Sequence, residues 1–176
     1  DNNIDLIEGG SFSRLSMLEH LDLSGNRLSS LDPPMLEGVG KLNSLDASRN
    51  NLMMIETGTF LNTPQLRELN LAQNMLNHLG KTTFDGLQAL DSLDLSENKS
   101  ERLNNTDFIM LWNLTSLDLS YNRIDVIKAA TFQDMQNMRE IHLNDNKIRE
   151  VEDGAFSVSS ITSLSLLGWL VLDNNN

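Results

Sequence analysis

The chain has 176 residues with 25 acidic and 13 basic side chains, a net charge of −12, and no cysteine. This balance argues against nucleic acid and anionic membranes as partners, because phosphate binding requires clustered Lys and Arg. The absence of cysteine excludes disulfides, thiolate metal sites and cysteine nucleophiles, and no apolar run approaches the roughly 18 residues of a membrane span.

A nine-residue pattern recurs along the chain, with apolar residues at its first, fourth and sixth positions and asparagine at its ninth. Residues 114–122 (LTSLDLSYN) are a clear copy. Copies start at Leu18, Leu42, Leu66, Leu90, Leu114 and Met138, and they end 24 residues apart at Asn26, Asn50, Asn74, Asn98, Asn122 and Asn146. A fixed period of this length predicts a solenoid of stacked repeats. We expect the six asparagines to form a structural ladder in which their side chains replace missing backbone hydrogen bonds.

Each repeat predicts a short strand followed by a return segment. In the repeat that starts at Leu114, we expect a strand over residues 115–119, with Leu117 and Leu119 in the core and Asp118 facing outward. Successive strands should stack about 4.8 Å apart in a parallel sheet. Ten residues after each ladder asparagine, and after Asn2 one period before Asn26, a convex core spine is expected at Phe12, Phe60, Phe84, Phe108, Phe132 and Phe156, with Leu36 in the remaining slot.

Residues 1–176 are expected to form a single array, with a partial repeat at 1–17 and an irregular final repeat from about 162–167 to 176. Asn175 follows Asn146 by 29 residues, so five residues are inserted near 157–163. Ser100 occupies a slot where an apolar residue is expected, and burial of its hydroxyl predicts a distorted repeat. Because solenoids need terminal caps and none is recognisable, we expect this chain to be an excerpt of a longer protein.

The pattern LxxLxLxxNxLxxL followed by a late Phe resembles the leucine-rich repeat family, in its 24-residue typical class, over residues 2–156. The resemblance implies an α/β-type solenoid, a right-handed superhelix with a concave parallel β-sheet and an irregular or 3-10 convex side. This class is characteristic of extracellular proteins such as Toll-like receptors, Slit and chaoptin. It therefore implies a protein-binding segment of the ectodomain of a secreted or cell-surface receptor or adhesion protein.

The concave face is the candidate binding surface, because ten acidic and only three basic residues are expected there. Such a field favours a basic protein ligand or co-receptor. The residues expected to contact it are Asp22, Asp46, Arg49, Arg67, Asp94, Asp118, Tyr121, Arg139, His142 and Trp169. Two alternatives stay open for these residues: the aspartates can be a common strand sequence of the family, satisfied by neighbouring serines, and Trp169 can instead cover the insertion.

A second hypothesis for the whole chain is a structural spacer or a homodimerisation module that uses the lateral or convex surface. Catalysis, a metal site and a cofactor are not expected. His20 and His142 are five repeats apart, roughly 24 Å at the strand spacing, which no metal can bridge. There is also no glycine-rich phosphate loop and no nucleophile elbow.

Three sequons are present, at Asn98, Asn104 and Asn113. Glycosylation requires an exposed loop in a secreted protein. Asn98 is a ladder residue, so we expect it to be unmodified. Asn104 and Asn113 are the candidate glycosylation sites, on the descending and convex side.

Overall fold

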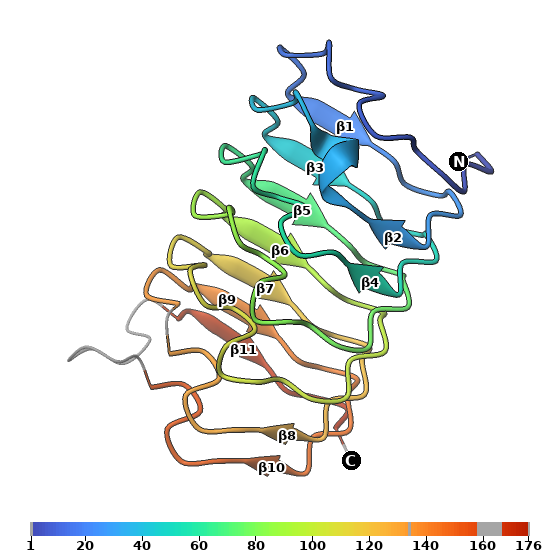
Figure 1. The fold of residues 1–176 in the computed structure, drawn as a ribbon. Helices are drawn as coiled ribbons and strands as arrows, with labels where there is room; N and C mark the ends of the chain where they lie inside the picture. The colour runs from blue at the N-terminus through green and yellow to red at the C-terminus, as the bar shows by residue number, and fades with distance from the viewer. Residues whose placement is uncertain (1, 134, 158–166, 176) are drawn as a thin grey trace.

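The computed structural model describes residues 2–133, 135–157 and 167–175. Successive turns of the chain lie side by side and form a solenoid (Figure 1). Its main sheet has seven parallel strands: β1 (His20–Asp22), β3 (Ser44–Asp46), β5 (Glu68–Asn70), β6 (Ser92–Asp94), β7 (Ser116–Asp118), β9 (Glu140–His142) and β11 (Trp169–Val171). Their order in the sheet follows their order in the chain, which confirms the expected stack of repeats.

The register of this sheet follows the repeat period. Leu21 pairs with Leu45, and Leu93 pairs with Leu117, each 24 residues further along the chain. The last pair steps by 29 residues, because Leu170 lies opposite Ile141. The insertion expected near 157–163 lies, apart from Ser157, outside the described residues. The sequence pattern nevertheless places β11 correctly in the sheet.

The rest of each turn is mostly irregular. Two short parallel pairs lie away from the main sheet, formed by β2 (Ser30–Leu31) with β4 (Met54–Ile55) and by β8 (Val126–Ile127) with β10 (Glu150–Val151). One 3-10 helix, η1 (Pro33–Leu36), begins where the side chain of Asp32 accepts a hydrogen bond from Met35 N. The described ranges contain no α-helix, so the irregular or 3-10 convex side is confirmed. No described helix is long and apolar enough to cross a bilayer.

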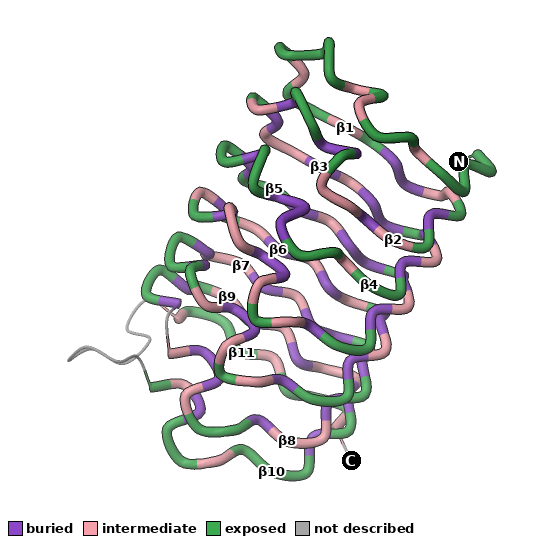
Figure 2. Tube along the Cα trace, viewed as in Figure 1, coloured by how far each residue is buried: buried purple, intermediate pink, exposed green. Residues whose placement is uncertain are grey.

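The core runs through the inside of every turn (Figure 2). Leu117, Leu119, Ile124 and Ile127 are all fully buried, because the alternation within the strand turns the leucines inward. The convex spine is also present: Phe84, Phe108, Phe132 and Phe156 stack with successive ring centroids 6.4, 6.1 and 5.3 Å apart. Phe60 and Leu36 are buried as well, while Phe12 is partly buried.

The ladder asparagines join one turn to the next. Asn122 Nδ2 donates to Leu95 O of the preceding turn at 2.9 Å, and its Oδ1 accepts from Ser100 N at 3.0 Å. Asn50, Asn74, Asn98 and Asn146 make the same bonds and are 5–7% exposed. The distortion expected at Ser100 is absent from its backbone, whose ladder bond has the usual length.

We predict that Asn122→Ala lowers the free energy of unfolding by about 2–4 kcal/mol, because it leaves buried carbonyl and N–H groups without partners. Asn26→Ala is the control. Asn26 is only half-buried and bonds to Leu23 O, Ser24 O and Ile4 N, so its loss should cost less than half as much. Urea unfolding followed by circular dichroism measures both, and equal losses would contradict the role assigned to the buried ladder.

Candidate functional site

The side chains at the first and third positions of each main-sheet strand point outward and form the concave face. The third positions make one column across the turns: Asp22, Asp46, Asn70, Asp94, Asp118, His142 and Val171. The first positions make a parallel column: His20, Ser44, Glu68, Ser92, Ser116, Glu140 and Trp169. Six of the ten predicted ligand contacts therefore lie in these two columns.

Each aspartate of the third-position column has a local structural role. Asp94 Oδ1 accepts from Ser96 N at 2.9 Å, and Asp118 Oδ1 accepts from both Ser120 N and Ser120 Oγ, at 2.8 and 2.6 Å. Asp22 and Asp46 make the equivalent bond to the second residue after each of them. These bonds close the turn where the strand ends.

Asn70 shows that the turn needs an acceptor and not a charge. It occupies the same slot, and its Oδ1 accepts from Ala72 N at 3.0 Å. Hydrogen bonds from Ser24 hold the pKa of Asp22 below its usual range. Because Asn70 closes the same turn, the carboxylate charge of the aspartates is additional to what the turn requires.

A second feature borders the concave face at the residue before each ladder asparagine. Six non-glycine residues there have positive φ, between 52° and 55°: Arg49, Gln73, Glu97, Tyr121, Asp145 and Asn174. We call these residues, together with Gly25, the rim column. Apart from Asn174 in the last described turn, their N–H groups donate to the next turn, as from Tyr121 N to Asn144 O at 3.0 Å. The ladder thus imposes a left-handed backbone, which costs a non-glycine residue on the order of 1 kcal/mol.

Tyr121 is the exposed aromatic residue of the rim column, with 55% of its surface accessible. The charge of Asp145 and a hydrogen bond to it raise the pKa of the Tyr121 hydroxyl, and Glu97 and Asp173 add to the effect. Gln73 Nε2 donates to Glu97 Oε1 at 2.8 Å. Glu97 and Asp145 are among the ten acidic residues that the sequence predicts on the concave face, but the sequence did not identify them as the neighbours of Tyr121.

Two predicted arginines line one hollow on the opposite edge of the sheet, before the strands begin. Arg67 and Arg139 line a hollow of about 420 Å³ together with Asn113, Asp91 and Thr115. Arg49 belongs to the rim column instead. The three arginines that the sequence grouped on one face therefore lie on two separate edges.

Trp169 lies at the end of the first-position column and is 69% exposed. It pairs in register with Glu140, whose Oε1 accepts from Ser116 Oγ at 2.7 Å. Its alternative role as a cover for the insertion concerns residues outside the described ranges. Across the described residues, no group of three or more His, Cys, Asp or Glu side chains is arranged to hold a metal ion.

The three sequons differ in how accessible their amides are. Asn98 is 7% exposed and belongs to the ladder. Asn104 is half-buried, and its backbone N–H and side-chain amide both face Asp107, which is 2% exposed. Asn113 is exposed, and its Nδ2 donates to Gln88 O at 2.6 Å. Of the two predicted glycosylation sites, Asn113 is thus the more accessible.

Comparisons with known proteins agree on the type of repeat. The family model described as leucine rich repeat matches residues 1–52, 41–99 and 112–176. A chain of the TLR13–ssRNA13 complex is similar, with a TM-score of 0.89 and 26% identity over 96% of this chain and 23% of that one.

Chains of the Drosophila Toll–Spätzle complex are also similar. The glycosylated form gives a TM-score of 0.80 and 23% identity over 96% of this chain and 22% of that one. A second structure of the complex gives 0.77 and 25% identity, covering 100% of this chain and 26% of that one. The chain thus spans about a quarter of the length of these structures. A search of curated protein sequences returned no match.

We predict that Asp94→Ala lowers the free energy of unfolding by about 1 kcal/mol, because Ser96 N loses its acceptor. Asp94→Asn should change it by less than half of that, since Asn70 closes the same turn with an amide oxygen. Urea titrations of the two variants make the comparison. If asparagine costs as much as alanine, the turn depends on the charge of Asp94 after all.

Replacing Tyr121 tests the strain of the rim column. Tyr121→Gly should raise Tm by about 2 °C, because glycine adopts the left-handed backbone without a steric cost. Tyr121→Phe keeps the Cβ and therefore the strain, so it should not raise Tm. Differential scanning calorimetry measures the change, and a lower Tm for the glycine variant would show that contacts of the tyrosine outweigh the strain.

Proposed function

The chain belongs to the leucine-rich repeat family, of the Toll-like receptor type, and on that premise we propose that it is a protein-binding segment of a secreted or cell-surface receptor or adhesion protein. The ligand in this proposal is a protein that presents Lys and Arg side chains to the concave face. The observation that carries the proposal is the column of carboxylates formed by Asp22, Asp46, Asp94 and Asp118.

The arrangement of these carboxylates supports a basic ligand. Each turn bond occupies Oδ1, and the second oxygen of Asp94 and of Asp118 has no hydrogen-bond partner within the part of the chain that the structure describes. Stacked carboxylates at the strand spacing of about 5 Å repel one another. A partner that brings positive charge relieves this repulsion and is drawn to the face by its field.

The rim column supplies the residues that would set the strength of the contact. Charged surfaces chiefly steer association, whereas aromatic and arginine side chains dominate affinity at interfaces. Tyr121 and Arg49 stand on one border of the acidic column, and Trp169 stands at the end of the neighbouring first-position column. We assign them the anchoring role in ligand binding.

A protein ligand fits the concave face better than a nucleic acid does. One of the similar structures is a complex with single-stranded RNA, so the alternative has a precedent in this type of repeat. Phosphate groups need clustered cations, while the two columns of this face carry aspartates and glutamates without any Lys or Arg. We therefore assign a basic protein surface to this face, and binding in place of catalysis.

The binding proposal can be tested by neutralising two carboxylates without disturbing their turns. We predict that Asp94→Asn with Asp118→Asn weakens binding of a fluorescein-labelled peptide of alternating Lys and Gly by about three- to tenfold at low ionic strength. Most of the change should appear in the association rate, because the field of the face is reduced. Stopped-flow anisotropy measures both rates.

The matched control removes the same charge elsewhere, with Glu37→Gln and Asp153→Asn, two exposed residues outside the main sheet. It should change binding less than twofold. If control and test variants lose binding equally, the peptide senses only net charge, and the concave face is not the site.

A further inference from the structure

A second charged surface lies on the loops that follow the ladder asparagines, apart from the two columns of the concave face. A hollow of about 470 Å³ opens there, lined by Glu101, Arg102, Arg123, Asp125, Lys147 and Arg149. We call these six residues the basic edge. Four of the six are cationic, in a chain whose acidic residues outnumber its basic ones by 25 to 13. The local charge is therefore opposite to that of the molecule.

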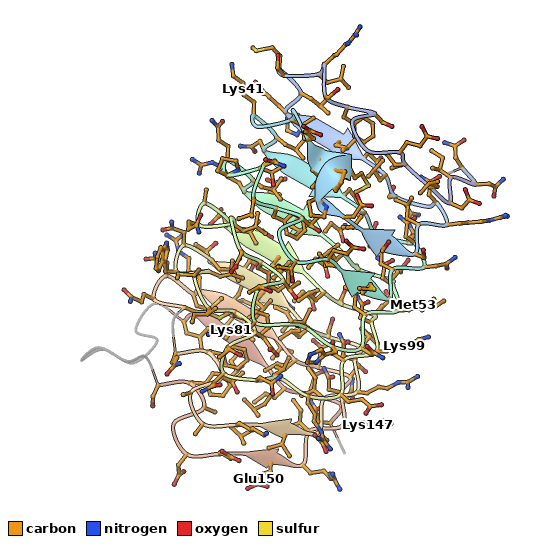
Figure 3. The ribbon with its side chains drawn as sticks, in the orientation of Figure 1. Lys41, Met53, Lys81, Lys99, Lys147 and Glu150 are labelled. Carbon is orange, nitrogen blue, oxygen red and sulfur yellow. The ribbon has the colours of Figure 1, made fainter. Side chains whose placement is uncertain are left out.

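The repeat aligns these cations. The residue directly after the ladder asparagine donates its N–H to the preceding turn, from Lys99 to Leu76 O, from Arg123 to Ser100 O and from Lys147 to Ile124 O, each at 2.9 Å. Their side chains therefore form a row with one cation per turn, about 5 Å apart. Lys99 and Lys147 project from the same edge of the solenoid (Figure 3).

Little of this charge is neutralised by the chain itself. Within the described ranges the only ion pair joins Arg149 Nη2 to Asp125 Oδ2, at 3.1 Å. That pair uses one of the two acids of the basic edge. Arg102, Arg123 and Lys147 are exposed and make no side-chain hydrogen bond in the same ranges. They remain available to an external anion.

We propose that the basic edge binds an acidic segment of a partner protein, at a site separate from the concave face. Exposed Arg and Lys side chains form charge-assisted hydrogen bonds with carboxylates, and Arg does so with two parallel bonds. The carboxylate of Glu101 lies among them. A protein segment of mixed charge can place a Lys or Arg there while its carboxylates meet Arg123 and Lys147.

Other polyanions fit this edge less well. A sulfated polysaccharide or a nucleic acid presents only negative charge along its length. Glu101 would repel such a ligand, because the ligand has no cation to pair with this carboxylate. Sequence-tolerant binding of single strands also uses aromatic stacking, and no aromatic side chain lines the hollow. A two-fold dimer through this edge would bring together two surfaces of the same net positive charge, which disfavours a second copy.

The test uses the 176-residue chain and a fluorescein-labelled peptide that repeats Glu-Glu-Lys-Glu. We expect Arg123→Glu with Lys147→Glu to weaken binding at least tenfold at low ionic strength. The control Lys41→Glu with Lys81→Glu makes the same charge change at two exposed lysines elsewhere on the surface (Figure 3) and should weaken it less than threefold. Asp94→Asn with Asp118→Asn should not weaken binding of this acidic peptide. A negative result at the basic edge therefore leaves the proposal for the concave face untouched.

Several results would overturn the proposal. Equal loss in the Arg123/Lys147 and Lys41/Lys81 variants would mean that the peptide responds to net charge alone. Tighter binding of a heparin oligosaccharide or a single-stranded oligonucleotide of matched charge, lost in the Arg123/Lys147 variant, would assign the edge to that polyanion instead. Self-association seen by light scattering and abolished in the same variant would assign it to a second copy. No binding of the peptide at all would leave the edge without this function.

Discussion

The amide ladder is the interaction on which the structure depends. Between the strand of one turn and its return segment, the backbone is buried but belongs to no sheet. Its N–H and C=O groups therefore need other hydrogen-bond partners. Asn74 and Asn122 provide them from inside: each side-chain amide donates to backbone carbonyls of its own turn and of the preceding turn, and each Oδ1 accepts from one backbone N–H. The ladder fixes the spacing of the turns, and with it the register of the main sheet and the stacking of the phenylalanines.

Two surfaces of opposite charge follow from this one backbone. Each repeat offers equivalent slots, and an exposed slot accepts any side chain that does not disturb the core. The third strand position carries aspartates that also close a turn, so charge and structure coincide there. The slot after the ladder asparagine carries Lys99, Arg123 and Lys147, which contribute only their backbone to the solenoid. A rigid scaffold can thus offer separate binding surfaces to two kinds of partner.

The period of 24 was enough to predict the solenoid, the main sheet and the phenylalanine spine, and the nine-residue pattern itself predicted the last strand at Trp169. It failed at Ser100, where a small hydroxyl fits without displacing the ladder. The binding roles of the predicted contacts remain proposals. Their placement was only partly predictable: Arg67 and Arg139 occupy one slot of the period, but the period alone does not show that this slot lies on the edge of the sheet and not on its face. The basic edge had a signal in the sequence, one cation after three successive ladder asparagines, but counting charge over the whole chain conceals it.

The left-handed backbone of the rim column restricts which residues can ever stand there. Its seven members are Gly25, Arg49, Gln73, Glu97, Tyr121, Asp145 and Asn174, and none is β-branched. Branching at Cβ makes positive φ markedly worse, so valine, isoleucine and threonine are barred while long, charged and aromatic side chains are tolerated. Neighbouring turns hold the main chain regardless of what is attached to it. Substitution at this position can therefore alter what the molecule recognises while the fold that presents it stays the same.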